Sequence, residues 1–267
     1  YPPNDSDARI IFASSLINAL SYLETTSLPQ LEYNKTRITE LSMVVVKRRH
    51  ILDTRAGAAP RVQDRFTMCF NPRRMVDPGS TEVTGLCNDL LEHQIDFNMN
   101  VFNAINGFLQ CLEQPVCLVA HNGDAFDFPI LKNHFEKLGV QLSDDILCAD
   151  SLHAFHDIFE IENRAFIQEQ NETTPKQLKH PPRMQNNSRK VSRKLFWGDS
   201  AKPTESYKLK KLYERILSRP GIEAHRAEND CIMAMEIAVS IAAKFVKWVD
   251  ENHMAFSAIK AMRLGSK

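Results

Sequence analysis

Short apolar runs along the chain predict a small number of buried strands. Arg37–Arg49 contains the run Met43–Val46 and is rich in β-branched residues, so we expect a mostly buried strand there. Asp64–Asn71 alternates Phe or Met with polar residues and predicts a second strand. Val116–Ala120 is wholly apolar, which is typical of a strand in the middle of a sheet.

Other segments space their apolar residues as amphipathic helices do. Helices are expected over Asn100–Cys111, Pro129–Leu138, Asp150–Ile161, Tyr207–Leu217 and Asn229–Asp250. Turn-forming residues fill Thr54–Pro60 and Pro78–Gly85. Strands that come first, with helices interleaved and following, predict an α/β domain with a central mixed sheet flanked by helices.

The composition is that of an ordinary globular protein. Of 267 residues, 43% are hydrophobic and 25% are charged, which excludes a disordered or collagen-like chain. The 33 basic and 33 acidic residues balance to a formal net charge of zero. This balance argues against a uniformly positive coat for nucleic acid, although a local basic patch remains compatible with it.

Cysteine usage and hydropathy indicate the compartment. The six cysteines form no CxxC pair and no zinc-finger spacing with His, so we expect neither a disulfide framework nor a zinc ribbon. Charged residues interrupt the apolar stretch Cys231–Val249, which excludes it as a membrane span. The segment before the apolar stretch Ile10–Leu20 contains Asp5 and Asp7. A signal peptide would have positively charged residues at that place. We therefore expect a protein of the nucleus or cytoplasm that is not secreted and not bound to a membrane.

One segment departs from the periodic pattern. Asn163–Thr204 is polar, and its part between Lys176 and Lys194 has seven basic and no acidic residues. We interpret it as a mobile insertion within one domain. It is either a solvated loop or an electrostatic arm for nucleic acid or nuclear import.

Acidic residues and a histidine stand at unusual places in three separated stretches. Glu24 ends an apolar stretch, Asp127 follows the strand predicted at Val116–Ala120, and Asp230 lies in the first turns of an apolar helix, five residues after His225. Ligands of α/β proteins bind at the carboxyl edge of the sheet, so Asp127 is well placed for chemistry. Each residue also has a simpler explanation, because Asp127 could cap a helix, Glu24 could end a strand and His225 could be a solvated loop residue.

Taken together, these stretches resemble the three-prime repair exonuclease (TREX) family. This family is part of the DEDDh group of 3′→5′ exonucleases with the DnaQ-like, ribonuclease H-type fold. The matching pieces, in the same order and spacing, are ETTSLP, RITELSMVVV, STEVTGL, CLVAHNGDAFDFPIL, ESYKLKKLY and AHRAENDCIMAM. The resemblance implies a single exonuclease domain over residues 23–262, with the insertion at about 163–204 and a tail at 263–267.

The resemblance also implies the chemistry and the residues that perform it. Two Mg²⁺ ions roughly 4 Å apart, with Mn²⁺ as a substitute, would be held by hard carboxylate oxygens. By resemblance, the metal ligands are Glu24, Asp127 and Asp230, and His225 is the general base. The positions expected to bind the 3′-terminal nucleotide are Thr25, Leu28, Pro29, Val83, Phe126 and His225.

The same resemblance implies the substrate and the oligomeric state. Single-stranded or frayed 3′ ends of DNA would be degraded to nucleoside 5′-monophosphates. The family forms homodimers through edge strands, so RITELSMVVV and DRFTMCFN are the expected dimer surfaces. RNA remains an open alternative, because no residue is seen to read the 2′-hydroxyl.

Position 22 departs from the family pattern. The family has Asp-x-Glu at the end of its first strand, and this chain has Tyr22 in place of the Asp, as well as Ser27 in place of a Gly. A phenol has a pKa near 10 and is a poor Mg²⁺ ligand. Residues 1–22 are therefore an atypical N-terminal segment, beginning with Tyr1 rather than Met, and are either foreign to the native product or part of a paralogue that has lost catalysis.

These observations leave three functions in competition. The first is a metal-dependent 3′→5′ DNA exonuclease with its activity in question. The alternative is a catalytically silent nucleic-acid-binding protein. A third is a protein-interaction module with a vestigial site, which would have no affinity for nucleic acid.

Overall fold

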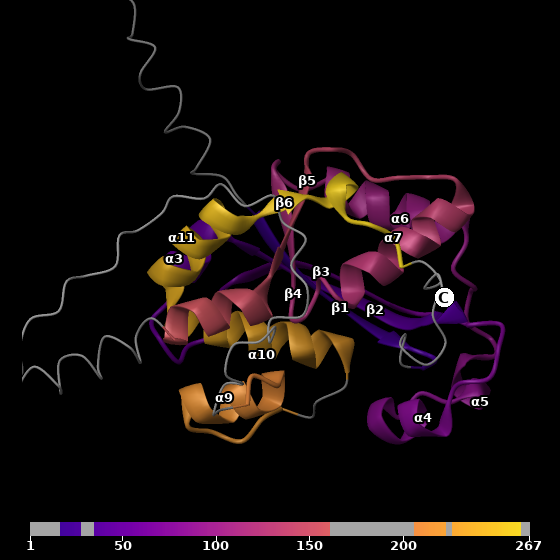
Figure 1. Ribbon diagram of the computed structural model, residues 1–267, viewed down its shortest axis with the longest axis horizontal. Coiled ribbons are helices and arrows are strands. Elements are labelled where there is room, and N and C mark those ends of the chain that lie inside the picture. Colours follow the sequence, from indigo (N-terminus) through magenta and orange to yellow (C-terminus); the bar gives the residue numbers. More distant parts are fainter. Residues whose placement is uncertain (1–16, 28–34, 161–205, 223–225, 263–267) are drawn as a thin grey trace, which may run out of the picture.

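A six-stranded mixed sheet forms the centre of the computed structural model (Figure 1). The structure describes residues 17–27, 35–160, 206–222 and 226–262, and the side chains of residues 17–19 are not described. The strand order is β3-β2-β1-β4-β5-β6. The strands are β1 Ile17–Thr25, β2 Ile38–Lys47, β3 Val62–Cys69, β4 Val116–Ala120, β5 Ile146–Asp150 and β6 Met254–Ala255.

The sheet is parallel in its centre and antiparallel at its sides. β1 pairs with β4 and β4 with β5 in parallel, whereas β1–β2, β2–β3 and β5–β6 are antiparallel. The carboxyl ends of β1, β4 and β5 therefore meet at one edge of the sheet. The mixed sheet expected from the sequence is confirmed.

Helices cover both faces of the sheet (Figure 1). They are α3 Arg48–Asp53, α4 Pro78–Thr84, α5 Asn88–Leu91, α6 Met99–Gln110, α7 Asp127–Leu138, α9 Leu209–Leu217, α10 Ala227–Ser240 and α11 Ala242–Asn252, with a further helix at residues 151–160 and the 3₁₀ turn η2 at Phe256–Ala258. None of the described helices is both long and apolar enough to cross a membrane.

The strand alternation divides the hydrophobic core into two clusters. Leu20 and Tyr22 of β1 pack into one cluster with α9, α10 and α11. Leu23 of the same strand packs into the other cluster with α6 and α7. β4 is buried at every position because both of its faces are covered, which accounts for its wholly apolar sequence.

Several expected boundaries are corrected by the structure. Pro78–Gly85 is not an open turn but the helix α4, capped by the Asp77 side chain and ended by Gly85 at φ 74°. The single helix expected over Asn229–Asp250 is two helices, α10 and α11, which meet at Ile241 with φ −126° and ψ 32°. Periodicity did not show this break because both halves are apolar on a buried side.

Two further expectations concern the ends of elements and the insertion. β1 begins at Ile17, so the last residues of the atypical N-terminal segment pair with β2 and β4. The basic insertion at Asn163–Thr204 lies outside the described residues. Its role and the division into domains stay predictions.

Candidate active site

The carboxyl end of β1 presents Tyr22 and Glu24 on the same face of the sheet. Alternate residues of a strand point to the same side, and Tyr22 belongs to the cluster that α10 covers. Glu24 lies directly opposite Glu40 of β2 in the antiparallel register. Tyr22, at the position of the family's first Asp, therefore lies on the same side of the sheet as Glu24.

Asp127 reaches this strand end from the first position of α7. β4 stops at Ala120, so Leu23 of β1 lies beyond the paired residues of the two strands. Asp127 Oδ1 accepts the backbone N–H of Leu23 at 3.0 Å, and only 3% of the Asp127 residue surface is exposed. The Asp127 carboxylate thus accepts a hydrogen bond from a β1 residue that lies past the end of the pairing with β4.

The turn that delivers Asp127 requires a glycine. A Cβ atom at Gly123 would lie 2.6 Å from Phe128 Cε2 and 2.7 Å from Ala120 Cβ. The turn is so tight because Phe128 N–H donates to the Gly123 carbonyl at 3.0 Å. The HNG sequence after β4 thus brings α7 close to the sheet.

Asp230 comes from the first turns of α10, which packs across β1 and β2. Cys231 Sγ donates to the Leu20 carbonyl at 3.2 Å and lies 3.6 Å from that of Ser42. Glu40 Oε2 accepts the N–H of Ala227, the first residue of α10, at 3.0 Å. A strand residue therefore caps the helix that carries Asp230.

Electrostatics show that the three predicted acids converge. Burial, together with the nearby carboxylates of Asp230, Glu40 and Asp127, raises the pKa of Glu24 to about 8. Burial, together with Asp150 and Asp230, raises the pKa of Asp127 well above its usual value, against the opposing hydrogen bond from Leu23. A site of this kind favours a bound cation, which would relieve the repulsion.

Tyr22 lies among these acids. Burial raises the pKa of its phenol well above 10, and Asp230, Cys231 and Asp127 add to the effect. The residue is 8% exposed, and its hydroxyl, beside Ser151, makes no hydrogen bond of normal geometry with the described residues. The phenol thus adds bulk and an unsatisfied hydroxyl where the family has a carboxylate.

The structure describes only some of the predicted nucleotide-binding residues. Thr25 is buried, and its hydroxyl donates to the Ser27 carbonyl at 3.0 Å. Val83 is 51% exposed on α4, and α4 is attached to the end of β1 because Asp77 N–H donates to the Thr26 carbonyl at 2.8 Å. Phe126 is partly buried and directly precedes Asp127. His225, Leu28 and Pro29 lie outside the described residues.

Asp150 at the end of β5 supports the turn before Asp127, and it was not among the site residues predicted from the sequence. Asp150, the last residue of β5, accepts the N–H groups of Asn122 and Leu152 at 2.9 Å and of Asp124 at 3.1 Å. Burial raises the pKa of Asp150 to about 6, although these N–H groups oppose the shift. Asp150 therefore holds the turn between β4 and α7, and its place at the end of a buried strand was the available signal.

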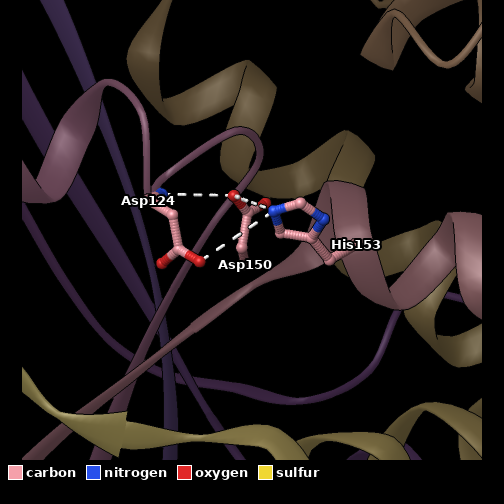
Figure 2. Close-up of side chains that lie close together, drawn as sticks. All are labelled: Asp124, Asp150 and His153. Atoms are coloured by element: carbon pink, nitrogen blue, oxygen red, sulfur yellow. Dashed lines mark hydrogen bonds and ion pairs between the residues drawn. The ribbon is translucent and has the colours of Figure 1, made fainter. Parts of the chain in front are cut away.

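Asp124 and His153 complete this group, as Figure 2 shows. His153 Nε2 lies 3.8 Å from Asp150 Oδ2 and 4.0 Å from Asp124 Oδ2. One ligand atom from each of the three residues lies within 4.8 Å of the others, which is close enough to hold a metal ion. The hydrogen bonds of Asp150 to the turn show that the group also has a structural role.

Comparison with known proteins agrees with this geometry. Residues 23–180 match the model of the family described as Exonuclease. The chain is 30% identical to three prime repair exonuclease 2 of Mus musculus, covering 90% of this chain and 89% of that protein. It is also 30% identical to three-prime repair exonuclease 1 of Bos taurus, covering 90% of this chain and 68% of that protein.

Solved structures share the fold at low sequence identity. The structure of cell-death related nuclease 4 superposes with a TM-score of 0.52 at 14% identity, covering 91% of this chain and 66% of that one. Exonuclease I of E. coli in complex with a dT13 oligonucleotide superposes with a TM-score of 0.57 at 14% identity, covering 89% of this chain and 43% of that one. With the sheet order, the family model and the relatives in agreement, the chain belongs to the three-prime repair exonuclease family of DnaQ-like 3′→5′ exonucleases.

Proposed function

We propose that this chain removes nucleotides from the 3′ ends of single-stranded or frayed DNA in a reaction that depends on divalent metal ions. The observation that carries the proposal is the convergence of Glu24, Asp127 and Asp230 from three separate elements. Asp127 is buried, Glu24 and Asp230 are partly buried, and each carboxylate opposes ionisation of the others, so folding alone has no use for the set. Metal-dependent hydrolysis of a phosphodiester bond uses such a set to bind the ions.

The residues present fit a hard cation. Glu24, Asp127 and Asp230 would hold Mg²⁺, or Mn²⁺ in its place, through carboxylate oxygens. When bound, the metal ions would activate water and stabilise the leaving oxygen. Asp127 stays oriented by the Leu23 N–H, and Asp230 by the cap that Glu40 provides to α10.

The remaining roles are assigned to the residues around the acids. His225, which precedes α10, would take the proton from the attacking water. Thr25, Leu28, Pro29, Val83 and Phe126 would hold the 3′-terminal nucleotide, by stacking and by wedging against bases. The products would be nucleoside 5′-monophosphates.

Tyr22 supports a second candidate function, a catalytically silent protein that binds nucleic acid. The buried phenol occupies the face on which the family has its first Asp, and it cannot provide an anionic ligand near pH 7. A protein of this kind would keep the nucleotide pocket and bind 3′ ends without cleaving them.

A degradation assay separates the two functions. A 5′-labelled single-stranded DNA is incubated with Mg²⁺ and three proteins: the chain itself, the Tyr22→Asp variant and the Asp230→Asn variant. Activity of the chain that Asp230→Asn abolishes would show that three carboxylates are enough. Activity of Tyr22→Asp alone would show that the phenol silences an otherwise complete site.

Binding measurements decide the remaining case. If none of the three proteins degrades DNA but all bind it with steep dependence on salt, the chain is a silent binder. If none binds, both functions are wrong and the chain is an interaction module.

We also infer a homodimer formed through edge strands. β3 lies at one edge of the sheet and pairs only with β2 among the described residues. An exposed edge of this length favours pairing with another strand, here that of a second copy. Sedimentation velocity should show a dimer, and a monomer at every concentration tested would contradict this inference.

The expected location in the nucleus or cytoplasm accords with the six free cysteines. Fluorescence microscopy of the tagged chain tests it, and an extracellular signal would contradict it.

A further inference from the structure

A cationic pocket lies beside the start of β2, apart from the acidic site. Its volume is about 720 Å³, and its charged lining consists of Lys35, Arg37, Arg73, Arg74, Lys137 and Asp96. We call it the basic pocket. The lining therefore has a formal charge of +4, in a chain whose formal net charge is zero.

The charged lining of the basic pocket contains a single carboxylate, Asp96. Asp96 pairs with Arg73 at 3.5 Å, and both side chains are exposed, so this pair contributes little stability. No carboxylate of the described residues pairs with Arg37. Burial lowers the pKa of Lys137, and the charge of Arg37 lowers it further. The two cations therefore repel each other across the pocket.

A buried histidine in the wall of the pocket has one ring nitrogen without a hydrogen bond among the described residues. His134 is 3% exposed, and its Nδ1 donates to the Ile130 carbonyl at 2.9 Å. Its Nε2 makes no hydrogen bond within the described part of the chain. Phe97, which also lines the pocket, packs against the ring with 5.0 Å between the two centroids. Because Nδ1 carries the ring proton, Nε2 is an acceptor, and it can donate to a phosphate oxygen only when the imidazole is protonated.

The basic pocket is connected to the strand that carries Glu24. Arg37 and Thr26 exchange hydrogen bonds, from Thr26 N–H to the Arg37 carbonyl at 2.9 Å and from Arg37 N–H to Thr26 Oγ1 at 3.1 Å. His134 lies on α7 seven residues after Asp127, which is about 10 Å along the helix. The pocket is thus a neighbour of the acidic site and shares no side chain with the predicted metal ligands.

We propose that the basic pocket is a phosphate-binding site that holds phosphodiester groups of a nucleic-acid strand. Arg and Lys bind phosphate oxygens through charge-assisted hydrogen bonds. Lys35 and Arg73 are exposed, so the pocket is accessible to a polymer as well as to a small anion. A small phosphate compound could make the same contacts. The experiment below distinguishes such a compound from a nucleic-acid strand as the ligand.

The experiment measures binding without turnover. The chain, in excess EDTA, is titrated with a fluorescently labelled single-stranded DNA and, separately, with inorganic pyrophosphate. The test variant is Arg37→Gln/Lys137→Gln. The matched control is Arg49→Gln/Lys247→Gln, which removes one exposed cation just after β2 and one exposed cation of α11. Thermal melting of every protein confirms folding, and Arg73→Gln, at an exposed position, replaces the double variant if that one is unfolded.

The expected result is a loss of about tenfold in DNA affinity for the test variant and little change for the control. The dependence of log affinity on log salt should become shallower by about 1.4, or about 0.7 for each lost phosphate contact. Pyrophosphate should also shift the nuclear magnetic resonance signal of the His134 imidazole in the unmodified chain.

Two other outcomes have definite meanings. If the test variant loses pyrophosphate binding but keeps its DNA affinity, the pocket binds a small phosphate compound and the nucleic-acid assignment is overturned. If neither ligand distinguishes the test variant from the control, the basic pocket is not a phosphate site. Neither outcome depends on catalysis at the acidic site, so failure of the proposed function would be seen separately.

Discussion

At the scale of single residues, the exchange of a carboxylate for Tyr22 has two physical consequences. It removes a negative charge from a crowded group of acids, and it buries a hydroxyl without a hydrogen bond of normal geometry among the described residues. The first change relieves repulsion in the protein without metal. The second change costs free energy.

We expect Tyr22→Phe to leave the melting temperature unchanged or slightly higher, because the lost hydroxyl has no such hydrogen bond. The control is Tyr213→Phe, since the Tyr213 hydroxyl donates to Glu236 Oε2 at 2.5 Å. Loss of a hydrogen bond to a charged group should lower stability by about 1.5–3 kcal/mol. Thermal melting by circular dichroism tests both variants, and a large loss for Tyr22→Phe would show that the phenol has a partner after all.

A second residue-scale prediction concerns Gly123. In Gly123→Ala the added methyl group would overlap Phe128 and Ala120, so stability should fall by about 1–3 kcal/mol. Mg²⁺ affinity should fall as well, because the same turn positions Asp127. The control is Gly107→Ala in α6, where a Cβ meets nothing within 4 Å and helix propensity should raise stability by about 0.5–1 kcal/mol. Calorimetric titration with Mg²⁺ and thermal melting measure both effects, and unchanged binding in Gly123→Ala would contradict the role of the turn.

At the scale of elements, the placement of α10 depends on a contact from β2. The helix begins with Glu228 and Asp230 in its first turn, and its own N-cap residue, Arg226, provides no side-chain cap. Glu40 instead accepts the Ala227 N–H from the neighbouring strand. Sheet and helix are therefore coupled at the residue that positions Asp230.

Glu40 provides two effects that substitution can separate. Glu40→Gln keeps an acceptor for Ala227 N–H and removes the charge that raises the pKa of Glu24, so stability without metal should be equal or higher. Glu40→Ala removes the cap and should cost about 1 kcal/mol, together with a weaker affinity for Mg²⁺. Melting and calorimetry distinguish the two variants. Equal stability of Glu40→Ala and Glu40→Gln would show that the cap contributes nothing.

At the scale of the whole molecule, the buried acids connect folding with pH and metal binding. The folded pKa of Glu24, about 8, lies above the value of about 4.3 in an unfolded chain. The folded state therefore keeps a proton that the unfolded state releases, and stability falls as the pH rises towards 8. Burial lowers the pKa of His121 and His134 to about 4, which acts in the opposite direction below about pH 6.5.

Between about pH 6.5 and 8 the two histidines no longer contribute to the change in stability, so this interval reports on the acids. Without metal, the chain should lose roughly 1–2 kcal/mol of stability over this interval because of Glu24, and Glu24→Gln should lose correspondingly less. Added Mg²⁺ should raise the melting temperature of the chain more at pH 8 than at pH 6.5, because it replaces the proton. Melting curves in EDTA and in Mg²⁺ measure this, and parallel pH profiles for the two proteins would contradict it.

Apolar periodicity located β2, β3, β4 and most of the longer helices, because burial against a sheet imposes its period on the chain. It did not predict β1 or β5, because polar residues such as Ser21 interrupt β1 and β5 is only five residues long. Val116–Ala120 has the same bounds in sequence and structure, since a strand buried on both faces must be apolar throughout. Glu24, Asp127 and Asp230 stand out as polar exceptions at the ends of apolar elements, but their role as metal ligands comes from the family resemblance and stays a prediction. The break between α10 and α11 could not, since both helices continue the same apolar pattern.

The contacts between distant segments required the folded chain. Glu40 caps α10 from 187 residues away, and Asp127 meets Leu23 from 104 residues away. The cations of the basic pocket come from three regions whose local sequence is unremarkable. Periodicity reports only which side of an element is buried, whereas the neighbours on that side are chosen by sheet order and helix packing.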